Sequence, residues 1–326
     1  MANQSLTGLR KPWVDGLRAL AQLMVICGHL QPRVPFIVIT SAIKIPLFFA
    51  ITGYVFRQRS EKEFYVNLCK RLILPWLALA MARYVGGAVF NGWAYLWEGA
   101  VSVITGKVVW FMPCIILAQI IHRYIRRFCP GPVWMTVASV VCFAAGRLLN
   151  RLGQPMMLDV ALTAQLYLLI GWFFARWEER PLFQSRWLPG VGLGIYGLLC
   201  VGSLLLFPGR MMNIQHQNYY HLPLNLLMIF TGCLSLMLLA KQIGKAPRLL
   251  CFIGQNTLIF YIWEAYPRTI FKKALSMVGL SLPEGIIGKL ILLVVTLIGC
   301  SLAALIMNRF LPELVGKNRK KIQEVL

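Results

Sequence analysis

Four polar side chains interrupt an apolar segment near the N-terminus. The segment runs from Trp13 to His29, and Asp15, Arg18, Gln22 and His29 lie within it. A helix turns by about 100° per residue, so Arg18 and His29 fall within about 20° of each other, with Gln22 and Asp15 on either side of Arg18. Imidazole transfers protons near neutral pH, and guanidinium binds phosphate.

Such a stripe is costly inside a bilayer, where charged groups usually face a protein interior or a water-filled cavity. The pattern therefore predicts a functional site on this helix. A stripe that only joins neighbouring helices stays open as an alternative. For Asp15 by itself, a role at the helix start is the simpler interpretation.

The elements that would position this stripe are membrane helices. The chain has 326 residues, 58% hydrophobic and 13% charged, about half the charge of a typical soluble protein. Apolar runs of membrane-spanning length recur throughout, which predicts an all-α, polytopic helical membrane protein with about ten transmembrane helices. The predicted segments are 13–30, 38–56, 72–90, 107–122, 132–149, 158–175, 188–207, 222–240, 249–265 and 286–308.

The distribution of positive charge predicts the orientation. The net charge is +22, but the basic residues cluster in alternate connections between the apolar segments. With the N-terminus inside, the cytoplasmic connections and tail hold more than twice as many lysines and arginines as the opposite side, which obeys the positive-inside rule. Both termini are thus predicted in the cytoplasm, with membrane lipid and no nucleic acid as the partner of these charges.

Cysteines and histidines give no sign of a metal site. The nine cysteines lie mostly in apolar runs, without a Cys-x-x-Cys pair, and the four histidines lack HExxH spacing. Phosphate-binding glycine loops and the GxSxG motif are absent as well. We expect no metal and no bound cofactor. Nothing divides the chain, so we expect one integral-membrane domain over 1–326 with a basic tail over 309–326.

Six segments together resemble a known family. They occur in the family's order, over nearly the whole chain: 14–21 with His29 ("DxLRGLA…H"), 45–55 ("PLFFxISGYL"), 69–75 ("KRxxRLxxPY"), 109–113 ("LWFLP"), 170–172 ("FxxGY") and 252–261 ("IGKNSLxIY"). The chain resembles acyltransferase family 3, the polytopic membrane acyltransferases, and within it the group related to fucose 4-O-acetylase.

The sequence departs from the family pattern at several positions. Leu68 replaces the first arginine of an RxxR pair, and Lys70 covers part of its role. Lys44 stands where this group often has histidine, and Glu264 where the family usually has one. Thr52 replaces a serine and keeps the hydroxyl. These departures leave the donor contacts and any second catalytic histidine open.

The resemblance implies transfer of an acyl group, usually acetyl, from cytoplasmic acyl-CoA to a glycan hydroxyl across the membrane. Acetyl-CoA would be a co-substrate, and the acceptor a surface polysaccharide or its lipid-linked precursor. The location implied is a bacterial inner membrane. Arg18 and His29 are about 16 Å apart along a helix, and a pantetheine arm has comparable reach.

Within this resemblance, His29 is the expected general base, taking the proton from the sugar hydroxyl as it attacks the thioester. Glu264 lies in an apolar segment, where a carboxylate needs a partner. It would orient His29 as part of the catalytic pair, or it would pair with Lys44 or Arg83.

Three cations are expected to bind the acyl donor: Arg18, Lys70 and Arg71. Arg18 would hold a donor phosphate or stabilise developing charge; an ion pair with Asp15 at i,i+3 is equally compatible. Lys70 and Arg71 would bind CoA phosphates at the cytoplasmic mouth, or they would serve only as topology determinants.

Four residues are expected to line the substrate cavity: Asp15, Lys44, Thr52 and Trp110. Lys44 could instead extend to the outer interface, and Trp110 could anchor the helix there. Thr52 with Gly53 is expected to allow close helix packing. His122, among arginines, is expected at the cytoplasmic surface.

Two other functions stay open on the sequence. The intramembrane charges also fit a transporter or flippase for a glycan or lipid. A non-catalytic partner in a glycan-assembly complex is the third. An acyltransferase would require acyl-CoA and would lose its activity on substitution of His29. A transporter would move an unmodified substrate. A non-catalytic partner would tolerate substitution of His29.

Overall fold

The computed structural model describes residues 10–30, 33–106, 109–150 and 155–317. All long elements in these ranges are helices, and pairing of extended backbone is limited to one bridge between Asn213 and Asn218. The predicted all-α fold is confirmed.

Seven helical segments are long and apolar enough to cross a membrane: Val34–Val55, Glu61–Ala88, Pro132–Leu149, Leu158–Trp177, Leu188–Leu206, Leu222–Ile243 and Ile286–Phe310. They contain helices α2 (Val34–Ser41) and α3 (Lys44–Val55), α4 (Glu61–Leu68) and most of α5 (Leu74–Asn91), α8 (Pro132–Leu149), α9 (Leu158–Thr163) and α10 (Gln165–Trp177), α12 (Leu188–Leu206), α13 (Leu222–Ile243) and α17 (Ile286–Phe310). The chain is therefore a polytopic membrane protein.

The other three predicted segments are helical too. They correspond to α1 (Pro12–His29), α7 (Phe111–Phe128) and the pair α14 (Arg248–Gln255) and α15 (Thr257–Trp263). Residues 107 and 108, at the start of the predicted α7 segment, lie outside the described ranges. Asn256 divides α14 from α15 because its backbone (φ −120°, ψ 19°) is not helical. The remaining helices are α6 (Trp93–Ile104), α11 (Pro181–Gln184) and α16 (Ala265–Met277).

A π-helical turn, Cys69–Ile73, joins α4 to α5. Pro75 has no backbone N–H to offer the carbonyl of Arg71, four residues earlier. The N–H of Leu74 bonds to the carbonyl of Cys69, five residues back, and not to that of Lys70, its α-helical partner. π-Helical turns inside α-helices often occur at functional sites, and this one carries Lys70 and Arg71.

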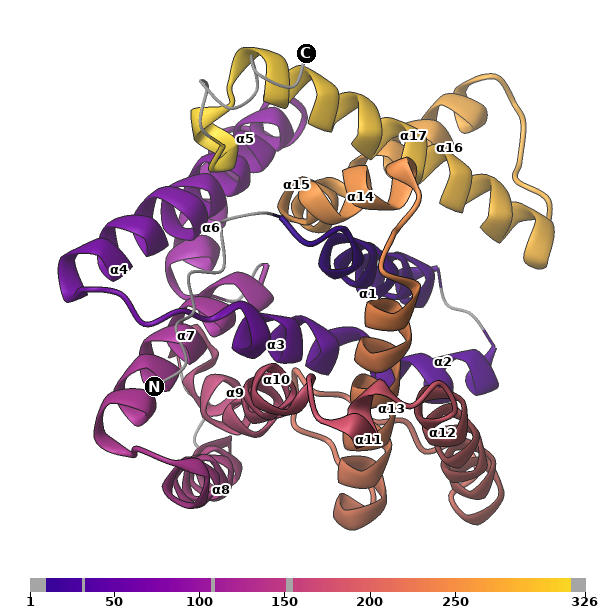
Figure 1. Cartoon of the computed structure of the whole chain (residues 1–326). Coiled ribbons are helices and arrows are strands. Elements are labelled where there is room, and N and C mark those ends of the chain that lie inside the picture. The colour runs from indigo at the N-terminus through magenta and orange to yellow at the C-terminus, as the bar shows by residue number, and fades with distance from the viewer. Residues whose placement is uncertain (1–9, 31–32, 107–108, 151–154, 318–326) are drawn as a thin grey trace.

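Helix α1 lies at the centre of the bundle, with α3, α13, α14 and α15 around it (Figure 1). Helix α3 in turn packs along α10. A Cβ on Gly171 of α10 would overlap the backbone carbonyl of Ala50, and one on Gly53 would overlap that of Leu168. The expected close packing at Gly53 is thus present, and it fixes α3 against α10.

Candidate active site

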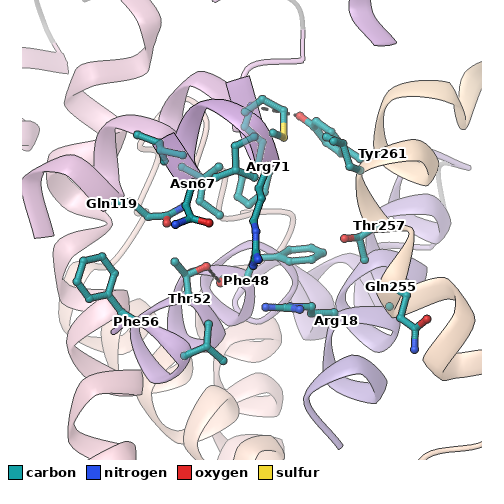
Figure 2. Close-up of a pocket in the computed structure, with 18 of the residues that line it drawn as sticks. Arg18, Phe48, Thr52, Phe56, Asn67, Arg71, Gln119, Gln255, Thr257 and Tyr261 are labelled. Atoms are coloured by element: carbon teal, nitrogen blue, oxygen red, sulfur yellow. Dashed lines mark hydrogen bonds between the residues drawn. The ribbon is translucent and has the colours of Figure 1, made fainter. Parts of the chain in front are cut away.

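A cavity of about 380 Å³ lies beside α1. Its walls come from α1, α3, α4 with the π-helical turn, α7, and the α14–α15 pair (Figure 2). Val315, beyond α17 in the short helical turn Glu313–Val315, also lines it. Segments far apart in the sequence therefore build one pocket.

One part of the cavity is strongly basic. Five arginines line it and, among the described residues that do so, none is acidic; the arginines are Arg10, Arg18, Arg57, Arg59 and Arg71. Arg18 from α1 and Arg71 from the π-helical turn extend toward one another across the pocket (Figure 2). Two guanidinium groups facing one space repel each other unless an anion lies between them.

Nearby carboxylates neutralise only part of this charge. Asp15, which is 2% exposed, accepts from Arg10 at 2.6 Å and lies 3.7 Å from Arg18. Glu63 pairs with Arg59 at 3.2 Å. The described partners thus supply two carboxylates for five guanidinium groups, so the cavity favours anionic ligands.

The rest of the cavity is apolar with a few amides and hydroxyls. Val25, Phe48 and Phe111 line it, as does Tyr261, whose hydroxyl accepts a hydrogen bond from the Phe111 N–H at 3.2 Å. Gln22 also lines the cavity; it is 1% exposed, and its Nε2 has no hydrogen-bond partner among the described residues. This part suits a long, mostly apolar chain carrying amide groups.

His29 and Glu264 form a pair just beyond the lined cavity. His29 is the last residue of α1, and Glu264 separates α15 from α16. Nδ1 of His29 is bonded to Oε1 of Glu264. The carboxylate is buried, whereas half of the His29 side chain is exposed. Val25 and Tyr261, which line the cavity, precede the two partners by four and three residues.

This arrangement can perform general base catalysis. A carboxylate that accepts a hydrogen bond from Nδ1–H fixes the imidazole tautomer and leaves Nε2 free to take a proton. It also stabilises the imidazolium that forms. The exposed half of His29 gives a hydroxyl from outside the bundle access to the ring.

Two further cations, Lys44 and Arg268, lie near the His29–Glu264 pair. A Cβ on Gly28 would be 2.9 Å from Nζ of Lys44, which places this ammonium group against the last turn of α1. Nη2 of Arg268, on α16, lies 3.9 Å from Oε1 of Glu264. Glu264 therefore partners His29 and lies close to Arg268.

The structure brings together most of the residues singled out in the sequence. Arg18, Arg71 and Thr52 line the cavity, and Asp15 forms the ion pair with Arg18 that the sequence left open. Thr52 also donates to the carbonyl of Phe48 at 2.8 Å. The association of His29 with Glu264 is one of the two arrangements that the sequence left open.

Four of the residues that were expected to bind the donor or to line the cavity are not among its lining residues: Asp15, Lys44, Lys70 and Trp110. Lys70 is exposed and is not among the lining residues, although its neighbour Arg71 is. Trp110 immediately precedes α7 and packs edge-on against Phe111, so it supports a cavity wall without lining it.

Other residues of the site do not stand out in the sequence. They are Arg10, Arg57, Arg59, Asn67 and Gln119; Gln255 and Tyr261 lie in the segment 252–261, without an expected role of their own. The cluster of basic residues after 38–56 is the available signal, but the positive-inside rule already accounts for it. The expectation for His122 was wrong: its side chain is fully buried and packs edge-on against Phe56, because α7 turns this face inward.

Comparisons with known proteins agree with this geometry. No curated protein and no solved structure matches the chain. Residues 11–305, by contrast, match the acyltransferase domain of acyltransferase family 3. The match begins just before α1 and ends in α17, so it includes the His29–Glu264 pair and all the residues that line the cavity except Arg10 and Val315. With this match over most of its length, the chain belongs to acyltransferase family 3 and is a membrane acyltransferase.

Proposed function

We propose that the protein transfers an acetyl group from cytoplasmic acetyl-CoA to a hydroxyl of a surface polysaccharide or of its lipid-linked precursor. One observation carries the proposal: a basic cavity beside α1 ends one helical turn short of a His–Glu pair. A donor with phosphates at one end and a reactive thioester at the other matches this polarity.

The donor fits in one direction. Its phosphates bind between Arg18 and Arg71, where charge-assisted bonds to guanidinium groups are strong. The pantetheine arm follows α1 past Gln22 and Val25, and the thioester reaches the end of the helix. Arg18 and His29 are about 16 Å apart along the axis.

The proposed reaction uses the His29–Glu264 pair. Nε2 of His29 takes the proton of the acceptor hydroxyl as its oxygen attacks the thioester carbonyl. The carbon–sulfur bond then breaks, and the imidazolium returns the proton to the leaving thiolate. Glu264 holds the ring and stabilises its positive charge between these steps.

The proposed orientation places the cavity mouth in the cytoplasm and His29 toward the outside of a bacterial inner membrane. The distribution of lysine and arginine supports it. Acetyl-CoA is made inside the cell, and surface glycans are completed outside, so one site reached from both faces would join them.

The test compares cells carrying the wild type, His29→Ala and His216→Ala. His216 is an exposed histidine on the loop before α13 and serves as the matched control. We expect acetyl signals in proton NMR spectra of the purified glycan with wild type and His216→Ala. His29→Ala at equal membrane abundance should lower them by about 100-fold or more.

Retained acetylation with His29→Ala would contradict the proposed base. If acetylation of the glycan is the same in all three strains but glycan export differs between them, a transporter is favoured instead, because a transporter needs no acyl-CoA. Glu264→Gln should give an intermediate loss, because the amide still positions the ring but no longer balances its charge.

A further inference from the structure

The surroundings of His29 carry more positive charge than the catalytic pair needs. Lys44 lies against the last turn of α1, and Arg268 lies near Glu264. Arg83, on α5, donates from Nη1 to the carbonyl of Ile262 at 3.5 Å, two residues before Glu264. Three cations therefore lie around the His29–Glu264 pair, and its single carboxylate is already bonded to His29.

Hydrogen-bond donors of two of these cations are buried and unused. Nη1 of Arg268 and Nε of Arg83 have no hydrogen-bond partner among the described residues, although neither atom reaches solvent. The Arg268 side chain is 18% exposed. A buried guanidinium nitrogen without an acceptor is unfavourable, so the arrangement favours an incoming acceptor atom.

The proposed donor does not supply that acceptor. Its phosphates would bind at Arg18 and Arg71, about 16 Å along α1 from His29, and the thioester that reaches His29 is uncharged. The leaving thiolate takes the proton back from the imidazolium. Glu264 supplies one negative charge to the cations Lys44 and Arg268, so a negative charge on the other substrate can balance the second.

We infer that the acyl acceptor is an anionic glycan. It would place a phosphate or carboxylate against Lys44 and Arg268 while a neighbouring hydroxyl faces Nε2 of His29. This inference rests on the proposed function. The anion can come from the phosphate of a lipid carrier or from an acidic sugar, and the shared chemistry is a delocalised oxyanion that guanidinium and ammonium groups bind.

The first experiment finds the acceptor among the host's own glycans. Purified protein is given acetyl-labelled acetyl-CoA and the total glycan and glycolipid extract of its host, and products are separated by anion exchange. We expect the label in the anionic fraction. Mild acid, which cleaves the sugar–phosphate linkage of a carrier, leaves the labelled glycan anionic if the charge is a sugar carboxylate and neutral if it was the carrier phosphate.

Label in the neutral fraction would overturn the inference while leaving acetyl transfer intact. Absence of label from every fraction, with wild type and His29→Ala alike, would instead count against the proposed function. The two failures are thus distinguishable.

The second experiment uses variants on the labelled acceptor. Lys44→Gln and Arg268→Gln should each raise the acceptor KM about tenfold, as expected for loss of one charge-assisted contact. The KM for acetyl-CoA should stay the same, and the salt dependence of acceptor binding should become weaker. Lys44→Arg should restore most of the affinity.

Arg210→Gln is the matched control, since Arg210 is an exposed cation on the loop before α13. A merely structural role would not alter the salt dependence. An acceptor KM in Lys44→Gln and Arg268→Gln equal to that of the control would overturn the assignment.

Discussion

Lys70 and Arg71 are adjacent basic residues that the sequence alone could not separate. In the structure Arg71 lines the cavity and extends toward Arg18, whereas Lys70 is not among the lining residues. We expect Arg71→Gln to raise the KM for acetyl-CoA about tenfold, because one charge-assisted contact to phosphate is lost. Lys70→Gln should leave it within about twofold. Steady-state kinetics with both variants measures this, and equal effects would contradict the assignment.

Gln22 offers a second prediction at the residue scale. Its Nε2 lacks a partner among the described residues, and the side chain lines the cavity between Arg18 and Val25. We expect Gln22→Leu to raise the KM for acetyl-CoA several-fold, because an amide donor to the pantetheine arm is lost. Stability should be unchanged or higher, since a buried unsatisfied amide is costly. A thermal shift in detergent accompanies the kinetics, and lower stability with unchanged KM would contradict this role.

Sequence reasoning at this scale reaches residues that share one element. Arg18 and His29 share one helix, so periodicity alone placed them on one face. Arg57 and Gln119 could not be found in this way, because their place in the cavity depends on how α3, α4 and α7 pack. The association of Glu264 with His29 joins residues 235 positions apart, so the sequence could offer it only as one of several pairings.

At the scale of elements, glycines decide how closely helices approach. Gly171 leaves no room for a Cβ against the backbone of α3, and Gly53 none against that of α10. We expect Gly171→Ala to destabilise the protein by about 1–3 kcal/mol through overpacking. Gly197 of α12 is the control, since a Cβ there meets nothing within 4 Å. Gly197→Ala should be neutral or slightly stabilising.

Thermal unfolding in one detergent compares the two alanine variants. Equal unfolding temperatures of Gly171→Ala and Gly197→Ala would show that α3 and α10 can move apart without loss of folding stability. The outcome also bears on the site, because α3 carries Lys44, Phe48 and Thr52.

The predicted elements were right in type and imprecise in their boundaries. Hydropathy detects long apolar runs, so 38–56 was expected as one helix, but a turn before Lys44 divides it into α2 and α3. Likewise, hydropathy does not register the π-helical turn at Cys69–Ile73, which lies just before Pro75. Both irregularities position site residues, Lys44 and Arg71.

At the scale of the whole molecule, the two ends of the described chain meet at the cavity. Val315 lines it together with Arg10, and Gly316 packs against the backbone of Arg71. Lys317 donates to Oδ1 of Asn256 at 2.7 Å, at the junction of α14 and α15. The beginning of the basic tail is therefore part of the site's wall. Residues 318–326 of that tail lie outside the described ranges.

The burial of Lys317 at the junction of α14 and α15 makes the folding stability depend on pH in a defined window. Burial lowers the pKa of Lys317 from 10.5 to about 8, and the nearby charge of Arg10 adds to the effect. Between about pH 8 and 10.5 the folded protein has released this proton while the unfolded chain still holds it, so rising pH stabilises the folded state there. Below about pH 8 both states are protonated, and this contribution no longer changes.

Lys317→Met removes the titrating group and isolates its effect from all others. We expect the unfolding temperature of the wild type to rise relative to that of the variant between about pH 8 and 9.5, and the difference to stay flat between about pH 6 and 7.5. A difference that stays constant over the whole range would mean that Lys317 is solvated in solution. The C-terminal segment would then leave the cavity open beside Arg71, and donor entry would not require it to move.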